Sequence, residues 1–195
     1  MSDFRYYKGI SKINYTKSME YMQVKVKAMK RKLLKGRKIW SALPMLLLMG
    51  VIFSFSAKTA VESSKSSNVI VDVLMDEHLI GGVAKDPEKV RELLSFLVRK
   101  SAHMAEFAVL AMLALFWLSS FPMTYRRRCI LAVLISACYA ATDEFHQLFV
   151  PGRSGEVRDV LVDTAGAVIG ILFLSLLRFI IIRKKKKQEA VIPGS

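Results

Sequence analysis

Four apolar segments, separated by polar or basic stretches, dominate the pattern of this chain. They cover about residues 39–57, 101–121, 129–150 and 160–182, and the first contains no charged residue. A helix needs about 20 predominantly apolar residues to cross the hydrocarbon core of a bilayer. The pattern therefore predicts an all-α membrane protein with four transmembrane helices, and an apolar fraction of 53% agrees with that class.

The polar stretch between the first two apolar segments, residues 58–100, has a helical pattern of its own. Apolar residues recur at helical spacing within residues 69–74 and again within residues 90–98. Asp86 followed by Pro87 is typical of a helix start. We therefore expect an amphipathic helical loop, whose second helix either lies on the bilayer or continues directly into the next span.

Basic residues flank the apolar segments and predict the topology. Twelve Lys and Arg lie within residues 1–38, three within 126–128 and five within 183–187, and the net charge is +14. Cytoplasmic segments are enriched in Lys and Arg. We therefore interpret residues 1–38 and 183–195 as basic cytoplasmic tails of a membrane domain at 39–182. A basic tail also suits nucleic acid, but no recognition module accompanies it.

Polar and ionisable residues collect at one end of the predicted spans. With this topology, the second and fourth spans begin at the outer side and the third ends there. These residues are Lys100, His103, Glu106, Asp143, Glu144, His146, Gln147, Asp159 and Asp163, with Arg153 and Arg158 in the short loop before the fourth span. Ionisable groups are expensive at membrane depth, so they mark either a function or a structural ion pair.

Helical spacing groups several of these residues. His103 and Glu106 are three residues apart and share a helix face. Asp159 and Asp163 lie on one stripe with Gly166, and a small residue there permits close helix contact. This packing predicts that both carboxylates face neighbouring helices rather than lipid.

Two longer motifs carry a resemblance to a known family. They are RKSAHMAEFAVLAML (residues 99–113) and DEFHQLFVPGRSGEVRDVLVDTAGAVIG (residues 143–170). The Lys-x-x-His-x-x-Glu opening, the Asp-Glu-x-His-Gln segment, the Pro-Gly-Arg turn and the Asp-x-x-x-Asp-x-x-Gly stripe resemble those of VanZ-like bacterial membrane proteins. The resemblance covers about residues 40–180. Phe107 stands where the family often has Tyr, so no hydroxyl is expected there.

The resemblance implies a multi-pass protein of the bacterial cell membrane, linked to glycopeptide resistance and especially to teicoplanin. Our first hypothesis is an outward-facing polar pocket that binds or modifies an anionic lipid or a cell-wall precursor. The catalytic candidates, with Glu144 or His146 as acid or base, are His103, Glu106, Asp143, Glu144 and His146. The substrate-binding candidates, with Lys100 and Arg153 holding the anion, are Lys100, Gln147, Arg153, Asp159 and Asp163.

Three other interpretations stay open. A non-catalytic scaffold would use the polar residues only as a clamp, with Lys100–Glu106 and Arg153–Asp159 as ion pairs. The His-x-x-Glu and Asp-x-x-His pairs could hold a metal, although no ligand pattern specifies one. A proton-coupled carrier is the third, but the four spans show no inverted repeat. The sequence contains no P-loop or dinucleotide fingerprint, so it indicates no particular cofactor.

Overall fold

The structure, a computed structural model, describes residues 22–27, 29, 36, 38–75 and 86–191. The chain divides into two units, residues 1–41 and residues 42–195. Most of the predicted basic tail at residues 1–38 lies outside the described residues.

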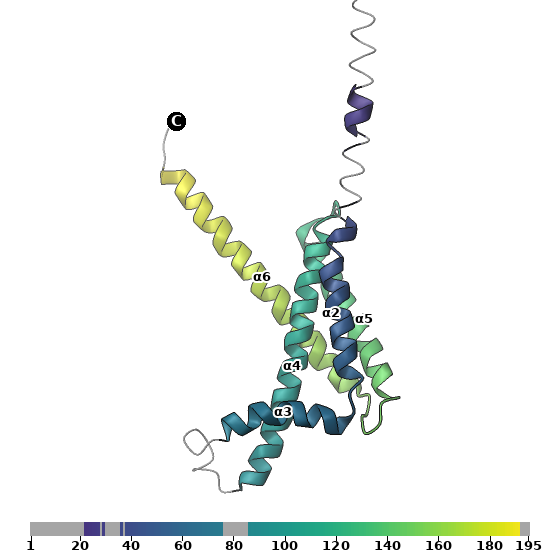
Figure 1. The fold of residues 1–195 in the computed structure, drawn as a ribbon. Helices are drawn as coiled ribbons and strands as arrows, with labels where there is room; N and C mark the ends of the chain where they lie inside the picture. Colours follow the sequence, from purple (N-terminus) through teal and green to yellow (C-terminus); the bar gives the residue numbers. More distant parts are fainter. Residues whose placement is uncertain (1–21, 28, 30–35, 37, 76–85, 192–195) are drawn as a thin grey trace, which may run out of the picture. The chain divides into compact units, whose positions relative to one another are not determined.

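The second unit consists of helices, and no strand occurs among the residues that the structure describes. The helices are α2 (Leu43–Ser56), α3 (Ala60–Leu74), α4 (Pro87–Leu118), α5 (Tyr125–Gln147) and α6 (Val157–Val191) (Figure 1).

Four helices are long and apolar enough to cross a membrane, which confirms the predicted all-α, four-span fold class. They cover Lys38–Ser56, Pro87–Leu118, Tyr125–Gln147 and Val157–Gln188. The helix that begins at Pro87 therefore continues directly into the second span instead of lying apart from it. Asp86 caps it, because its side chain accepts the backbone N–H of Lys89 at 3.4 Å.

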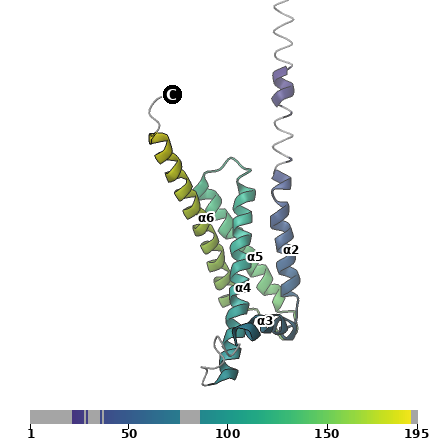
Figure 2. The same ribbon diagram turned by 60° about the vertical axis from the view of Figure 1, so that its left-hand side comes forward.

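Helix α4 is the centre of the bundle and contacts α2, α3, α5 and α6. Its apolar side chains form much of the core, with Phe107, Leu110, Ala111 and Ala114 fully buried. Helix α6 crosses α4 closely near its N-terminal half and then diverges from the other helices in both views (Figures 1 and 2). Its basic residues 183–187 extend the helix beyond the predicted end at residue 182, since Lys and Arg are good helix formers.

Two glycines allow the close crossing of α4 and α6. The backbone of Gly166 meets the backbone of Met104, and the backbone of Gly170 meets that of Ala108 one turn further along. A Cβ at either position would overlap a carbonyl oxygen of α4. The close helix contact predicted at Gly166 is thereby confirmed, because only hydrogen in place of a side chain permits this approach.

Helix α3 lies across the end of the bundle (Figures 1 and 2), and its orientation reverses a soluble-protein expectation. Val69, Ile70 and Val73 are exposed, although their spacing predicts an apolar face. The buried face carries Ser67 and Val71 instead, and the Ser67 hydroxyl shares a hydrogen bond with that of Ser95 on α4 at 3.1 Å. In an apolar solvent this arrangement is favourable, because lipid accepts the aliphatic side chains while hydroxyls pair within the protein.

The start of α3 is anchored by a reciprocal cap. The Thr59 hydroxyl accepts the backbone N–H of Glu62 at 3.3 Å, and a Glu62 carboxylate oxygen accepts the backbone N–H of Thr59 at 3.0 Å. These hydrogen bonds from Thr59 lower the pKa of Glu62. Because α2 ends at Ser56, the cap turns the chain sharply and places α3 directly beside Lys58.

Candidate functional site

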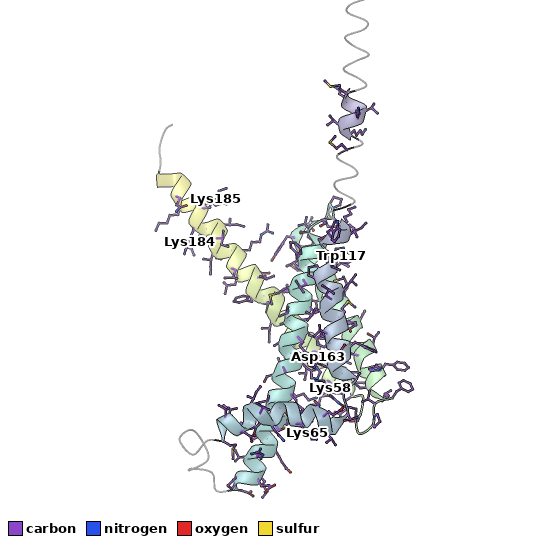
Figure 3. All side chains as sticks on the ribbon, in the orientation of Figure 1. Lys58, Lys65, Trp117, Asp163, Lys184 and Lys185 are labelled. Atoms are coloured by element: carbon purple, nitrogen blue, oxygen red, sulfur yellow. The ribbon has the colours of Figure 1, made fainter. Side chains whose placement is uncertain are left out.

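The polar residues of the spans gather at the end of the bundle where α3 lies. Figure 3 places Lys58 and Asp163 near this end, whereas Trp117 and the α6 residues Lys184 and Lys185 lie toward the other end. We call the first of these the α3 end. The basic residues that predict the cytoplasmic side are thus separated from the polar cluster by the length of the bundle.

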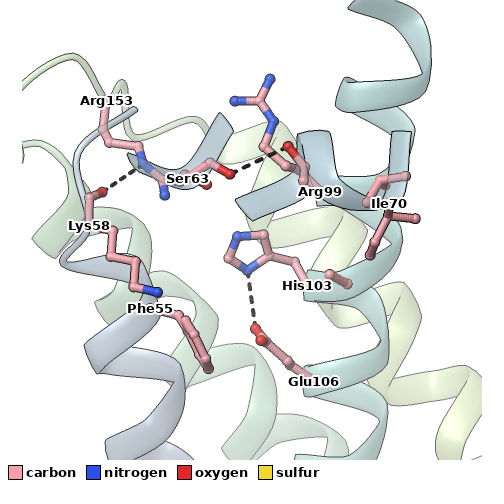
Figure 4. A pocket seen from close by; sticks show the side chains of 11 residues that line it. Phe55, Lys58, Ser63, Ile70, Arg99, His103, Glu106 and Arg153 are labelled. Carbon is pink, nitrogen blue, oxygen red and sulfur yellow. Dashed lines mark hydrogen bonds and ion pairs between the residues drawn. The ribbon is translucent and has the colours of Figure 1, made fainter. Parts of the chain in front are cut away.

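A first cavity of about 200 Å³ opens at the α3 end, between α2, α3, α4 and the loop of residues 148–156. Its lining residues are Phe55, Lys58, Ser63, Ser67, Ile70, Val98, Arg99, Ala102, His103, Glu106 and Arg153 (Figure 4). Three of these are permanent cations and one is a carboxylate. Phe55, Ile70 and Val98 give the same cavity an apolar wall, so it combines charge with surface for hydrocarbon.

Arg153 is positioned by the turn that precedes it. Gly152 has φ of 74°, a left-handed conformation that other residues rarely adopt. The Arg153 backbone N–H donates to the Val150 carbonyl at 3.1 Å, and its Nε donates to the Lys58 carbonyl at 3.3 Å. Burial and the neighbouring Arg99 guanidinium lower the pKa of Arg153. The guanidinium stays protonated, and its positive charge is incompletely compensated.

His103 and Glu106 point toward one another from successive turns of α4 (Figure 4). The His103 Nδ1 and a Glu106 carboxylate oxygen lie 3.5 Å apart. The contact does not have hydrogen-bond alignment, and both atoms are buried without a hydrogen-bond partner among the described residues. The pair therefore retains capacity to bind or exchange a proton with a third group.

A second cavity of about 180 Å³ lies between α4, α5, α6 and the same loop. Its lining residues are Phe96, Arg99, Lys100, His103, Glu144, Gln147, Gly152, Arg153, Ser154, Glu156, Asp159 and Asp163. Arg99, His103 and Arg153 line both cavities, so the two are adjacent.

Two internal contacts shape the second cavity. Lys100 forms an ion pair with Asp159 and so ties α4 to the start of α6. A Glu144 carboxylate oxygen accepts the backbone N–H of Glu156 at 2.9 Å, which holds the end of the loop against α5.

A buried cluster beside the second cavity, which Gln147 also lines, joins α2 to α5. The Ser56 hydroxyl donates to Asp143 Oδ2 at 2.6 Å, and Gln147 Nε2 donates to the same oxygen at 3.1 Å. Ser56, Asp143 and Gln147 are 0%, 2% and 4% exposed. These contacts satisfy one oxygen of a carboxylate that is almost wholly removed from solvent.

A comparison with known protein families shows to which family the chain belongs. Residues 41–178, more than two thirds of the chain, match the model of the VanZ/LLP1 family. The chain belongs to the VanZ/LLP1 family. This finding confirms the resemblance carried by the sequence motifs. Among curated proteins and among solved structures, no match to the chain was found.

In this VanZ/LLP1 family member, the fold brings most of the candidate site residues together. Those that line a cavity are Lys100, His103, Glu106, Glu144, Gln147, Arg153, Asp159 and Asp163. Asp143 and His146 line neither cavity. Asp143 is held by Ser56, and the His146 ring packs on Phe53 with 4.4 Å between ring centroids. His146 faces α2 because it lies on a different side of α5 from Glu144.

The ion pairs differ from the two that the sequence suggested, and this is a correction. Lys100 pairs with Asp159 of α6, not with Glu106. Six residues on a helix separate two side chains by about 9 Å along the axis and about 120° around it, so they do not share a face. Arg153 donates to a backbone carbonyl of Lys58 rather than pairing with Asp159. Arg158 is exposed and lines neither cavity.

Sequence reasoning missed Lys58, Arg99 and Ser56 as site residues. Arg99 could have been found, because its spacing of four from His103 and seven from Glu106 puts all three on one helix face. Lys58 is the first charge after an apolar span, and that position alone indicated an interface residue. Nothing in the local pattern indicates that Ser56 meets a carboxylate 87 positions later.

The His-carboxylate pairs do not assemble into a larger ligand set. Within the described ranges, no group of three or more His, Cys, Asp or Glu residues has positions that could hold a metal ion. His103 and Glu106 remain a two-residue pair on α4.

Proposed function

We propose that this VanZ/LLP1 family member binds an anionic amphiphile, a lipid or lipid-linked cell-wall precursor, at the outer face of the bacterial cell membrane. The observation that carries the proposal is the lining of the first cavity. Lys58, Arg99 and Arg153 all line it, beside an apolar wall. A phosphate group would take the cations, and a hydrocarbon chain would lie against the apolar residues.

The charge balance of the first cavity favours an anion. Lys58 lies over the Phe55 ring, with 4.4 Å from its nitrogen to the ring centroid. Arg99 donates to the Ser64 hydroxyl at 3.4 Å. Among the described residues, no carboxylate forms an ion pair with Lys58, Arg99 or Arg153. Guanidinium groups match phosphate and carboxylate geometry with two parallel donors, so a ligand anion would complete the set.

The outward orientation follows from the positive-inside rule. The basic residues 126–128 and 183–187 belong to the end opposite the α3 end, and such clusters favour the cytoplasm. The site would then face the compartment where cell-wall precursors and outer-leaflet head groups are found. By this route we link the site to glycopeptide and teicoplanin susceptibility, as membership of the family suggests.

For chemistry on a bound head group, the geometry favours His103 with Glu106 over the other catalytic candidates. Both line the first cavity, and their facing atoms are 3.5 Å apart. One carboxylate oxygen of Glu144 already accepts the backbone N–H of Glu156. Asp143 and His146 line neither cavity. A general acid or base must be within reach of the reacting group.

Native mass spectrometry of the gently solubilised protein tests the binding proposal. The wild type is expected to retain an anionic lipid, and Arg153→Ala is expected to lose it. Arg158→Ala is the matched control, since it removes the same charge five residues later from an exposed position outside both cavities. Equal lipid retention by all three proteins would contradict the proposal.

A non-catalytic scaffold is the second candidate function, and specific contacts favour it. The Lys100–Asp159 pair and the Ser56–Asp143 hydrogen bond join α4 to α6 and α2 to α5. If clamping were the whole role, Arg153→Ala would lower thermal stability and membrane abundance without changing the lipid bound. The same purified variants therefore separate the two functions.

A further inference from the structure

Asp163, in the second cavity, is a buried carboxyl group without a partner. It is 3% exposed and lines the cavity from α6. Within the described part of the chain it makes no hydrogen bond and no ion pair, whereas Asp159 one turn before it is paired with Lys100. A carboxyl group this deeply buried is costly unless a donor or a positive charge meets it.

The position of Asp163 is imposed by the packing of α6. Gly166, three residues later on the same stripe, lies against the backbone of Met104, so α6 has little freedom to rotate. The carboxyl group must consequently face α4 and α5, where the second cavity lies. The Asp163 side chain therefore cannot reach bulk solvent, as the side chain of an exposed acidic residue does.

Glu144 adds a second acceptor on the same cavity wall. It is 6% exposed, and only one of its oxygens is engaged by the Glu156 backbone N–H. Lys100 is already occupied by Asp159. The wall formed by Asp163 and Glu144 therefore offers acceptors without a dedicated cation from the described residues.

An ammonium group is the complement that this wall fits. It carries one positive charge and three donors, enough to meet both carboxyl groups. A divalent metal fits less well, because the described histidines and carboxylates form no group of three or more with the required placement.

The adjacency of the two cavities restricts the ligand further. Arg99, His103 and Arg153 line both, so a group held by these cations lies one side chain away from the carboxyl wall. We propose that the protein takes an amine-bearing phosphate ester, an aminophospholipid type of head group, with its phosphate at Arg99 and Arg153 and its ammonium at Asp163 and Glu144. This inference rests on the proposed function and specifies its ligand class.

Competition between two lipids tests the inference. The purified protein is mixed with equal amounts of dioleoyl phosphatidylethanolamine and its N-acetylated derivative, which keeps the phosphate and removes the ammonium. Native mass spectrometry then gives the ratio of the two complexes. The wild type is expected to prefer the free amine by about tenfold, the effect of one charge-assisted hydrogen bond. Asp163→Asn should reduce the preference about tenfold while phosphate-dependent binding persists.

Glu92→Gln is the matched control, because it makes the same carboxylate-to-amide change at an exposed residue of α4 outside both cavities. It should keep the wild-type ratio. If the wild type binds neither lipid, the amine-bearing ligand class is wrong, and the retention of a co-purified anionic lipid decides separately whether the proposed function stands. If it binds both equally, the amine site is wrong while the proposed function stands, and this comparison needs no variant to fold. A preference unchanged in Asp163→Asn would also overturn the inference.

Discussion

Replacing Gly166 with Ala is expected to push α6 away from α4. A Cβ at this position would overlap the carbonyl oxygen of Met104 and lie 2.9 Å from its carbonyl carbon. Backbone atoms do not move aside as the end of a flexible side chain does, so the helices must separate. Asp163 stands one turn before Gly166 on the same stripe, so the shift should also loosen the Lys100–Asp159 ion pair.

Two opposing effects determine the change in the free energy of unfolding, and we expect a net decrease. Overpacking a close contact costs about 1–3 kcal/mol, whereas Gly to Ala within a helix stabilises by about 1 kcal/mol. Gly50 on α2 is the matched control, because a Cβ there meets no atom within 4 Å. The difference between Gly166→Ala and Gly50→Ala therefore isolates the packing cost from helix propensity.

Thermal unfolding in one detergent, followed by intrinsic fluorescence, measures this difference. Gly50→Ala should unfold at or above the wild-type temperature, and Gly166→Ala should unfold at a temperature roughly 2–12 °C below that of Gly50→Ala. The same samples can be used for lipid retention, which should fall for Gly166→Ala alone. If the two variants unfold at the same temperature, the close α4–α6 contact does not stabilise this fold and the reasoning is refuted.

Two further predictions concern α3 and the topology. Because the hydrogen bonds from Thr59 lower the pKa of Glu62, the cap stabilises α3 above the usual pKa of 4.5 and this contribution is lost as the pH falls below it. The protection factors of the α3 amides, which compare the observed exchange rates with the intrinsic rates at the same pH, should fall at acidic pH in the wild type but not in Glu62→Gln; wild-type protection factors that do not fall contradict the prediction. Single cysteines test the orientation in cells, with native cysteines replaced: Ser154→Cys, at an exposed position of the loop, should react with an impermeant thiol reagent from outside, and Gln188→Cys only after permeabilisation. The reverse labelling would place the cavities on the cytoplasmic side.

Helix existence was predictable here because its causes are local. Residues 101–118 are apolar over the length of a bilayer, and Asp86 with Pro87 marks a helix start whatever the surroundings. The remaining choice, whether that helix lies on the membrane or continues into the span, depends on residues 90–100. These have neither a break nor a cap, and α4 runs through them without interruption.

The partner of Lys100 was not predictable from the sequence. Helical spacing excludes Glu106, since six residues put the two side chains on different faces of α4, but no local pattern indicates that Lys100 meets Asp159 of α6. The exposure of Val69 and the burial of Ser67 also reverse the rule that apolar side chains pack inside a protein and polar side chains face outward. In a chain with four helices long and apolar enough to cross a membrane, an apolar pattern does not by itself identify the face that packs.

The sequence by itself determined the fold class, the family and the end of the bundle at which the polar residues collect. These depend on hydrophobic length, charge asymmetry and motif order, which are properties of the chain read in one dimension. Only the tertiary structure decided that Lys58, Arg99 and Arg153 line one cavity and that Asp163 lines another without a partner. The reason is geometric, because the crossing of α4 and α6 and the placement of α3 determine which side chains from distant segments come within reach of one ligand.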